Sequence, residues 1–369
     1  MAFDRQAALR IAFPIGTFAT AAALHLTGRP FEHLPQLAGL ALGVIGVAVV
    51  FVTVFIVLHH AEKVAHRTGE PYGTLILTFS VTAIEVSVIL SMMLHGENNP
   101  TLARESVFST VMIVCAGVVG LCLTLGGLRH RQQEIKRQGT SAFLAALIAL
   151  TVLTLVLPDF TLAAEPGEFS PVQLAFVSML SVLLYGSFVY AQMASHRDDF
   201  VEERLAEIED VNDAHERTSV WLSVLLLIVG LVGIVLMTEL VAGGIEDKLV
   251  ELQVGQADAI VGAFIAALVL MPESAAAVRA ALNNELQRSL NIALGSACAT
   301  IGMTIPAVAL ASLITGRGLT LGLNAGDTVL LVLALSISVV SFGTGRTTVM
   351  TGLVHLVVFF AYLFLIVVP

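Results

Sequence analysis

The chain has 369 residues, of which 57% are hydrophobic and 12% are charged, and its mean hydropathy is +0.91. This composition excludes an ordinary soluble globular protein and is typical of a chain that crosses a membrane many times. The formal charge of -10 says little by itself, because the distribution of charge among loops sets the orientation of a membrane protein. Cys115, Cys122 and Cys298 lie inside apolar runs without metal-ligand spacing, so neither a disulfide framework nor a zinc site is expected.

Eleven apolar runs are candidates for membrane-spanning helices, each of which needs about 20 mostly apolar residues. They cover residues 7–27, 36–58, 72–94, 105–127, 141–157, 171–193, 219–240, 258–279, 289–314, 326–343 and 349–368. The first run could instead be a signal peptide, but the loop charges fit best when it is retained. The sequence therefore predicts an all-α polytopic membrane protein with about 11 transmembrane helices.

The basic residues indicate how these helices are oriented. With the N-terminus in the cytoplasm, only Arg29, Arg104, Lys248 and Arg317 of the 18 Lys and Arg residues fall on the outer side. This asymmetry follows the positive-inside rule, and residues 129–137 (RHRQQEIKR) are its firmest anchor. We therefore expect a multi-pass protein of a bacterial inner membrane with a cytoplasmic N-terminus.

The longest polar interruption divides the chain into two halves. Residues 197–217 hold nine acidic and three basic side chains, and form either a solvated connector or a local concentrator of cations. The predicted domains are a leading helix (1–33), a first five-helix repeat (34–195), the cytoplasmic acidic connector (196–217) and a second five-helix repeat (218–369). Five crossings leave the chain on the opposite side, so the second repeat must be inverted, which is a transporter architecture.

Each half carries one glutamate inside its second apolar run. Glu85 is the only charged residue between Tyr72 and Leu94, and Glu273 is the only one between Ala259 and Val278. A charge at this depth costs about 3 kcal/mol on insertion scales, so such residues usually face a cavity or a partner. Either acid alone could be a protonated glutamate that hydrogen-bonds a neighbouring helix, but their matched position favours a shared cation and proton site.

Neighbouring oxygen atoms could complete such a site. Thr78 and Thr82 share a helix face with Glu85, and Pro272 has no N–H to donate to the carbonyl of Leu268, although the proline could equally be a packing kink. Hydroxyls also line the following run of each half. Ser109 lies 24 residues after Glu85, and Ser296 lies 23 residues after Glu273.

At these residues the chain resembles the calcium:cation antiporter superfamily, and most of all its bacterial ChaA-type cation/proton antiporter branch. The resembling stretches are GTLILTFSVTAIEVSVIL (73–90), SVFSTVMIVCAGVVGLCLTLGG (106–127), LVLMPESAAAVRAALNNELQRSLNIALGSACATIGMTIP (268–306) and GTGRTTVMTGLVHLVVF (343–359). The resemblance implies two inverted five-helix repeats after a leading helix, and ion exchange by alternating access. It also implies that Glu85 and Glu273 are the essential acids, and that Ser109 and Ser296 are the small polar residues at the matching helix starts.

The chain departs from the better-known exchangers of the superfamily at one point. Those proteins have an Asn shortly before each acid, whereas residues 81–84 and 270–272 contain none here. Asn291 stands elsewhere, beside the second hydroxyl stripe, and is a further candidate ligand. With fewer carboxamide oxygens, the identity of the ion stays open among Ca2+, Na+ and K+.

The sequence thus predicts a secondary antiporter, not an enzyme, that exports a metal cation in exchange for protons. Glu85 and Glu273 are its expected cation and proton ligands, and Thr78, Thr82, Ser109, Ser296, Asn291 and Leu268 are the supporting ones. The alternatives are a passive cation channel and a membrane-embedded hydrolase. The chain contains neither GxxxxGK[ST] nor HExxH, which disfavours an ATP-driven pump and a zinc protease.

No cofactor is expected beyond the transported ions. The expected partners are inorganic cations, protons and the lipid bilayer, with no nucleic acid. The sequence indicates neither an oligomeric state nor the roles of His59, His60 and His355.

Overall fold

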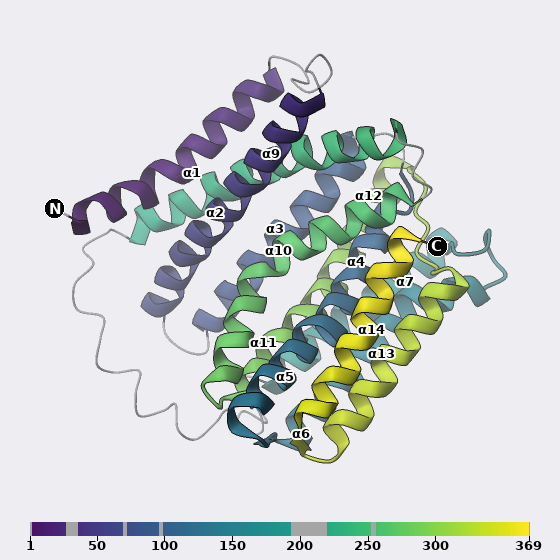
Figure 1. The fold of residues 1–369 in the computed structure, drawn as a ribbon. Coiled ribbons are helices and arrows are strands. Elements are labelled where there is room, and N and C mark those ends of the chain that lie inside the picture. Colours follow the sequence, from purple (N-terminus) through teal and green to yellow (C-terminus); the bar gives the residue numbers. More distant parts are fainter. Residues whose placement is uncertain are drawn as a thin grey trace. The chain divides into compact units, whose positions relative to one another are not determined.

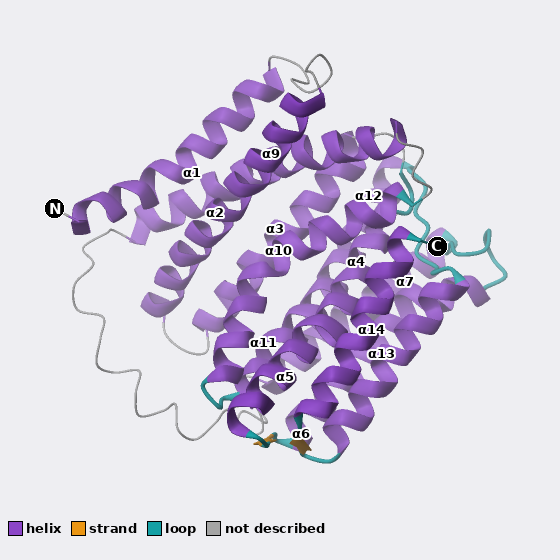
Figure 2. Ribbon diagram, in the orientation of Figure 1, coloured by secondary structure: helices purple, strands orange, loops and turns teal. Residues whose placement is uncertain are grey.

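The computed structural model describes residues 2–26, 36–68, 72–95, 99–192, 220–251 and 256–368. These residues are almost entirely helical, as Figure 2 shows. Within the described part of the chain, the only named strands are β1 (Gln133–Glu134) and β2 (Arg346–Thr347), which pair antiparallel. The acidic connector lies outside the described residues, so its predicted role stays a prediction.

Each of the eleven predicted runs is helical over its described residues. Along the chain they are α1 (Ala2–Leu26), α2 (Gln36–Thr68), α3 (Tyr72–His95), α4 (Leu102–Met112) with η1 (Ile113–Val118) and α5 (Val119–His130), α6 (Arg137–Thr151) with η2 (Val152–Val156) and η3 (Leu157–Phe160), α7 (Pro171–Tyr190), α9 (Val220–Glu251), α10 (Ala257–Leu282), α11 (Leu286–Ala299) with η5 (Thr300–Thr304) and α12 (Ile305–Thr315), α13 (Ala325–Gly343) and α14 (Val349–Val367). By length and composition, 10 of them could cross a membrane within the described residues. Helix α3 adds a shorter apolar stretch, Phe79–Met93.

Polar residues at the chain reversals explain where several helices begin. Ser170 and Gln173 form a capping box before α7, and Pro171 stands at the first helical position, where its missing N–H costs nothing. Asn324 caps α13 by accepting a hydrogen bond from the Asp327 amide at 2.8 Å. The sequence thus starts these apolar helices at defined residues.

The helices group into two compact units, each with members from both halves of the sequence. Unit 1 comprises residues 1–97 and 215–257, and unit 2 comprises residues 98–214 and 258–369. Grouping by contact is a different criterion from repetition in sequence, so it leaves the predicted repeat boundaries untested.

Unit 1 is built around α9, which packs against α1 and α2. Glycines allow the close approach, because a methyl group at Gly233 would lie 2.9 Å from the Phe18 backbone nitrogen. The Thr17 and Thr53 hydroxyls are 2.8 Å apart between α1 and α2. Near the predicted inner end, Arg10 donates to His59 Nε2 at 2.8 Å. Small and polar residues thus hold this unit together where apolar burial alone gives no drive in lipid.

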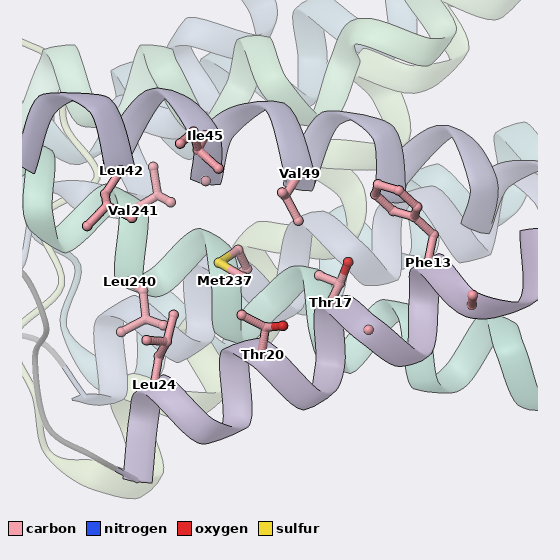
Figure 3. Close-up of a pocket in the computed structure, with 13 residues that line it drawn as sticks. Phe13, Thr17, Thr20, Leu24, Leu42, Ile45, Val49, Met237, Leu240 and Val241 are labelled. Carbon is pink, nitrogen blue, oxygen red and sulfur yellow. The ribbon is translucent and has the colours of Figure 1, made fainter. Parts of the chain in front are cut away.

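An apolar groove of about 360 Å³ opens between α1, α2 and α9 (Figure 3). Its lining residues are Ala12, Phe13, Gly16, Thr17, Thr20, Leu24, Leu42, Ile45, Gly46, Val49, Met237, Leu240 and Val241. Only the two threonines bring side-chain oxygen, and Thr17 already bonds Thr53. The groove therefore lacks the charged ligands that a cation site needs.

In unit 2, α14 lies along η1 and α5, and Figure 1 shows α14 beside α5. Glycines line this contact on both sides. A methyl group at Gly120 would lie 3.0 Å from the Leu356 backbone nitrogen, and one at Gly352 would lie 2.8 Å from the Gly120 carbonyl oxygen. Because the two backbones approach this closely, α14 packs directly along the third helix of the first half.

The loops of unit 2 gather at two separate ends. At one end, Thr101 donates to Asp258 at 2.8 Å and the Thr320 amide donates to the Pro100 carbonyl at 3.0 Å. At the other end, Gln133 donates to the Ala281 carbonyl at 3.0 Å, and β1 pairs with β2. The first end collects loops predicted outside and the second collects loops predicted inside. The alternation of the spans therefore agrees with the charge pattern.

Candidate cation and proton site

Glu85 lies near the middle of α3, a helix of 24 residues in unit 1. Its side chain is buried at 2% exposure, and Thr82, one turn earlier, is buried as well. Ile84, Val88 and Ile89 beside it are also buried, so the carboxyl group stands in an apolar helix. The side chain of Thr78 lies outside the described residues. Glu85 and Thr82 are thus buried on one helix, and their roles as ligands stay a prediction.

Glu273 lies in α10, immediately after Pro272. The helix runs from Ala257 to Leu282 through the proline, so the helix is not broken at this point. Leu268 is buried, and Pro272 offers its carbonyl no N–H. Ser274 donates to the carbonyl of Leu270 at 2.7 Å. Backbone and side-chain oxygens therefore cluster on the turn that carries Glu273.

Glu85 belongs to unit 1 and Glu273 to unit 2. Their convergence on one cation stays a prediction, as do the ligand roles of the other named residues. Among the described residues, no group of three or more His, Cys, Asp and Glu side chains is placed to hold a metal ion. A transported cation is cargo, not a resident cofactor.

Ser109 and Ser296 occupy matching positions in the two halves. Ser109 precedes the π-helical segment η1 by four residues, and Ser296 precedes the π-helical segment η5 by the same number. Both helices lie in unit 2. π-Helical turns are rare and frequently occur at functional sites. The correspondence predicted from sequence offsets thus extends to a shared distortion of the helix.

The hydroxyl of Ser109 has a partner that the sequence does not reveal. Tyr362 in α14 donates to Ser109 Oγ at 2.7 Å, and both side chains are 1% exposed. The two residues are 253 positions apart. A tyrosine near the end of an apolar helix is read most simply as an interfacial or packing residue, so no pattern pointed to it.

Asn291 lies one turn after Gln287 at the start of α11. Its side-chain oxygen accepts a hydrogen bond from Gln287 Nε2 at 2.9 Å. Gln287 in turn accepts from the Lys136 amide at 2.8 Å through its own oxygen. Asn291 therefore helps to join α11 to the start of α6, at the end of unit 2 that is predicted to be cytoplasmic.

Two further charged groups were missed by sequence reasoning. Glu239 lies near the end of the seventh predicted run (219–240), and the apolar stretch in the structure reaches Ile245, which places Glu239 a further turn from the end of the candidate span. Ser91 of α3 donates to Glu239 at 2.5 Å within unit 1. The available signal was a carboxylate inside a predicted run that continues with the apolar residues 240–245.

The other missed group is a buried ion pair at the start of α4. Arg104 Nε donates to Glu105 Oε1 at 2.9 Å, and Arg104 Nη1 donates to the Gly322 carbonyl at 2.8 Å. Glu105 is 5% exposed. The guanidinium therefore joins α4 to the chain that precedes α13, whereas the sequence suggested only a charge in an outer loop.

The architecture is that of a multi-pass integral membrane protein with a leading helix and two inverted five-helix repeats. The model of the family described as sodium/calcium exchanger protein matches residues 38–194 and, separately, residues 222–368. The chain belongs to the sodium/calcium exchanger protein family.

Two curated bacterial relatives match most of the chain. One is y4hA of Sinorhizobium fredii, whose name designates an ionic transporter, at 43% identity over 86% of each chain. The other is the sodium-potassium/proton antiporter ChaA of Escherichia coli, at 36% identity over 88% of each chain. The Ca2+/H+ antiporter ChaA of Bacillus subtilis is more distant, at 23% identity over 79% of this chain and 82% of its own.

Solved structures share the fold. Native YfkE superposes with a TM-score of 0.68 at 17% identity, covering 98% of this chain and 99% of its own. The H+/Ca2+ exchanger CAX superposes with a TM-score of 0.66 at 14% identity, covering 96% and 87% respectively. At these identities the likeness shows the fold alone.

Proposed function

We propose that the chain is a secondary active antiporter that exports a metal cation in exchange for protons, by alternating access, across a bacterial inner membrane. One observation carries the proposal. Each half of a chain that matches the exchanger family twice places a glutamate inside its second spanning helix and a serine four residues before a π-turn in its third. A duplicated arrangement of acid and hydroxyl suits a single ion site between repeats.

In this mechanism, Glu85 and Glu273 share a site that holds either protons or a cation. Two acids at one site in a low dielectric resist ionisation together, so a cation between them competes with protons for the same oxygens. An empty and fully ionised site is costly to move through the membrane. Only the proton-loaded and cation-loaded states then interconvert readily, and that restriction couples the two fluxes.

We propose Na+ or K+ as the exchanged cation, with Ca2+ as the alternative. The relative named as a sodium-potassium/proton antiporter is 36% identical, whereas the one named as a Ca2+/H+ antiporter is 23% identical. Ca2+ takes six to eight oxygen ligands. The absence of Asn beside either acid removes two side-chain oxygens that could serve it.

The test uses sealed everted membrane vesicles in which a proton gradient has been formed. Addition of Na+, K+ or Ca2+ should release protons in a saturable way, and Glu85→Gln and Glu273→Gln should each abolish the release because the site loses an ionisable oxygen pair. Glu165→Gln, at an exposed acid in the loop before α7, is the matched control and should behave as wild type.

If Glu85→Gln and Glu273→Gln both kept full cation-driven proton release, the assignment of the site would be refuted. Cation entry without any linked proton movement, measured at a clamped membrane potential, would identify a passive channel instead of an antiporter.

A further inference from the structure

One backbone carbonyl in the helix that carries Ser109 lacks the donor that a regular α-helix would give it. In a regular α-helix the Val119 amide would donate to the Cys115 carbonyl, four residues earlier. At the end of η1 it donates instead to the carbonyls of Val114 and Ala116. The Cys115 carbonyl thereby loses its usual α-helical donor, and Cys115 itself is fully buried. A buried carbonyl needs a donor, so another group can take the place of the Val119 amide.

His355 of α14 supplies such a donor. Its Nδ1 lies 2.7 Å from the Cys115 carbonyl oxygen, and its side chain is 1% exposed. A carbonyl can only accept, so Nδ1 carries the hydrogen. The other ring nitrogen lies 3.0 Å from Ser341 Oγ, and the ring stacks on Phe342. The imidazole is therefore held by α13 while it donates to η1.

Helix α14 contacts the Ser109 segment at a second point on the same face. Tyr362 follows His355 by seven residues, or about two helical turns, and donates to Ser109. Between these two contacts, the ring of Phe359 lies against Gly117 of η1. The two donors thus bracket the stretch from Ser109 to Cys115, with His355 at the Cys115 carbonyl and Tyr362 at the Ser109 hydroxyl.

We propose that His355 is a positioning residue that keeps η1 in its π-helical form and so fixes the direction in which Ser109 points. A π-turn contains one more residue than the α-helical turn it replaces. If η1 relaxed to an α-helix, residues before it would rotate by roughly 100° about the axis relative to α5, because each residue turns the helix by that amount. Ser109 would then leave Tyr362 and its place in the site.

The second half differs from the first in the residues that follow its π-turn. Pro306 follows η5 directly after Ile305, and it has no N–H to donate to the carbonyl of Gly302. The first half has no proline at the corresponding place, since Val119 and Gly120 follow η1. In the first half, His355 supplies the Cys115 carbonyl with a donor from another helix.

The experiment compares three replacements of His355 in the full chain. His355→Asn keeps a donor at the place of Nδ1, His355→Gln moves the donor toward the place of Nε2, and His355→Leu removes it. Ser341→Ala is the control, because it removes the other partner of the ring and leaves the bond to Cys115. Deuterium uptake by peptides that cover residues 109–121 is measured in purified protein, and cation-driven proton release is measured in everted vesicles.

We expect His355→Leu to take up deuterium in this segment about tenfold faster than wild type, since a lost buried hydrogen bond exposes the helix to opening. We also expect it to need a cation concentration about tenfold higher for half-maximal exchange. His355→Asn and Ser341→Ala should stay within about threefold of wild type in both measurements, and His355→Gln should lie between.

Equal deuterium uptake in wild type and His355→Leu would overturn the proposal. It would also be overturned if His355→Asn took up deuterium as fast as His355→Gln. If the Leu variant does not fold, the comparison between the Asn and Gln variants still tests the proposal. The transport part rests on the proposed function, but deuterium uptake does not. Wild-type vesicles without cation-driven proton release would therefore refute the function alone.

Discussion

Tyr362 and Ser109 form a buried pair that joins the last helix of the second half to the third helix of the first. The phenol donates to the serine oxygen and so occupies one of its two lone pairs. The hydroxyl hydrogen and the second lone pair of Ser109 remain available to other groups. The ring also packs edge-on against Phe108, with centroids 5.6 Å apart. The hydroxyl is therefore directed by a side chain that is itself fixed.

Removal of this phenol oxygen should weaken cation exchange without unfolding the protein. In Tyr362→Phe we expect the cation concentration for half-maximal proton release to rise about three- to tenfold, because a typical hydrogen bond contributes ~0.5–1.5 kcal/mol. Tyr190→Phe, at an exposed tyrosine on α7, is the matched control. The measurement is a titration of everted vesicles with each cation, and equal shifts in both variants would contradict the role given to Tyr362.

At the scale of single residues, the sequence made Glu85, Glu273, Ser109 and Ser296 candidates for the site because duplication repeats their spacing. It did not identify Tyr362 or His355, whose partners lie 253 and 240 positions away. Nor did it assign Asn291 to the Gln287 contact at the start of α11. Local patterns report which residue types share a helix face, whereas only folding decides which helix stands opposite.

At the scale of elements, apolar length predicted the long helices of the described residues, but not their irregularities. The π-turns η1 and η5 leave no trace in hydropathy, because the residues that form them are as apolar as their neighbours. Helix α9 also runs to Glu251, beyond the predicted limit at residue 240. Helices continue past the point where apolar residues become sparse, because the backbone hydrogen bonds persist in water as well.

Glycine contacts between α14 and α5 give a prediction at the same scale. We expect Gly352→Ala to lower the midpoint of thermal unfolding, because the added methyl group would press on the Gly120 carbonyl and on Thr124. Overpacking of this kind costs roughly 1–3 kcal/mol. Gly186→Ala is the control, since a methyl group there meets nothing within 4 Å. The two midpoints are compared in the same detergent, and a midpoint of Gly352→Ala equal to that of the control would show that the helices do not pack this closely.

At the scale of the whole molecule, the orientation of the chain can be tested directly. Glu165 and Gln132 are both exposed, and they lie in loops predicted outside and inside respectively. In intact cells, a membrane-impermeant maleimide should label Glu165→Cys and spare Gln132→Cys, while everted vesicles should give the opposite pattern. The native cysteines are free and buried, as expected from their apolar surroundings, and should contribute little background. Labelling of both positions from one side would refute the alternation.

The sequence by itself determined the membrane class and the eleven helical runs, and it predicted their orientation and the two acids of the candidate site. These properties follow from the free energy of transferring side chains from water to lipid and from duplication of the chain. Both leave patterns that are visible in the linear sequence. Only the tertiary structure decided that α14 supplies donors to Ser109 and to the carbonyl of Cys115. Lipid is as apolar as the helices, so partner choice depends on close backbone approach and on hydrogen bonds between distant residues.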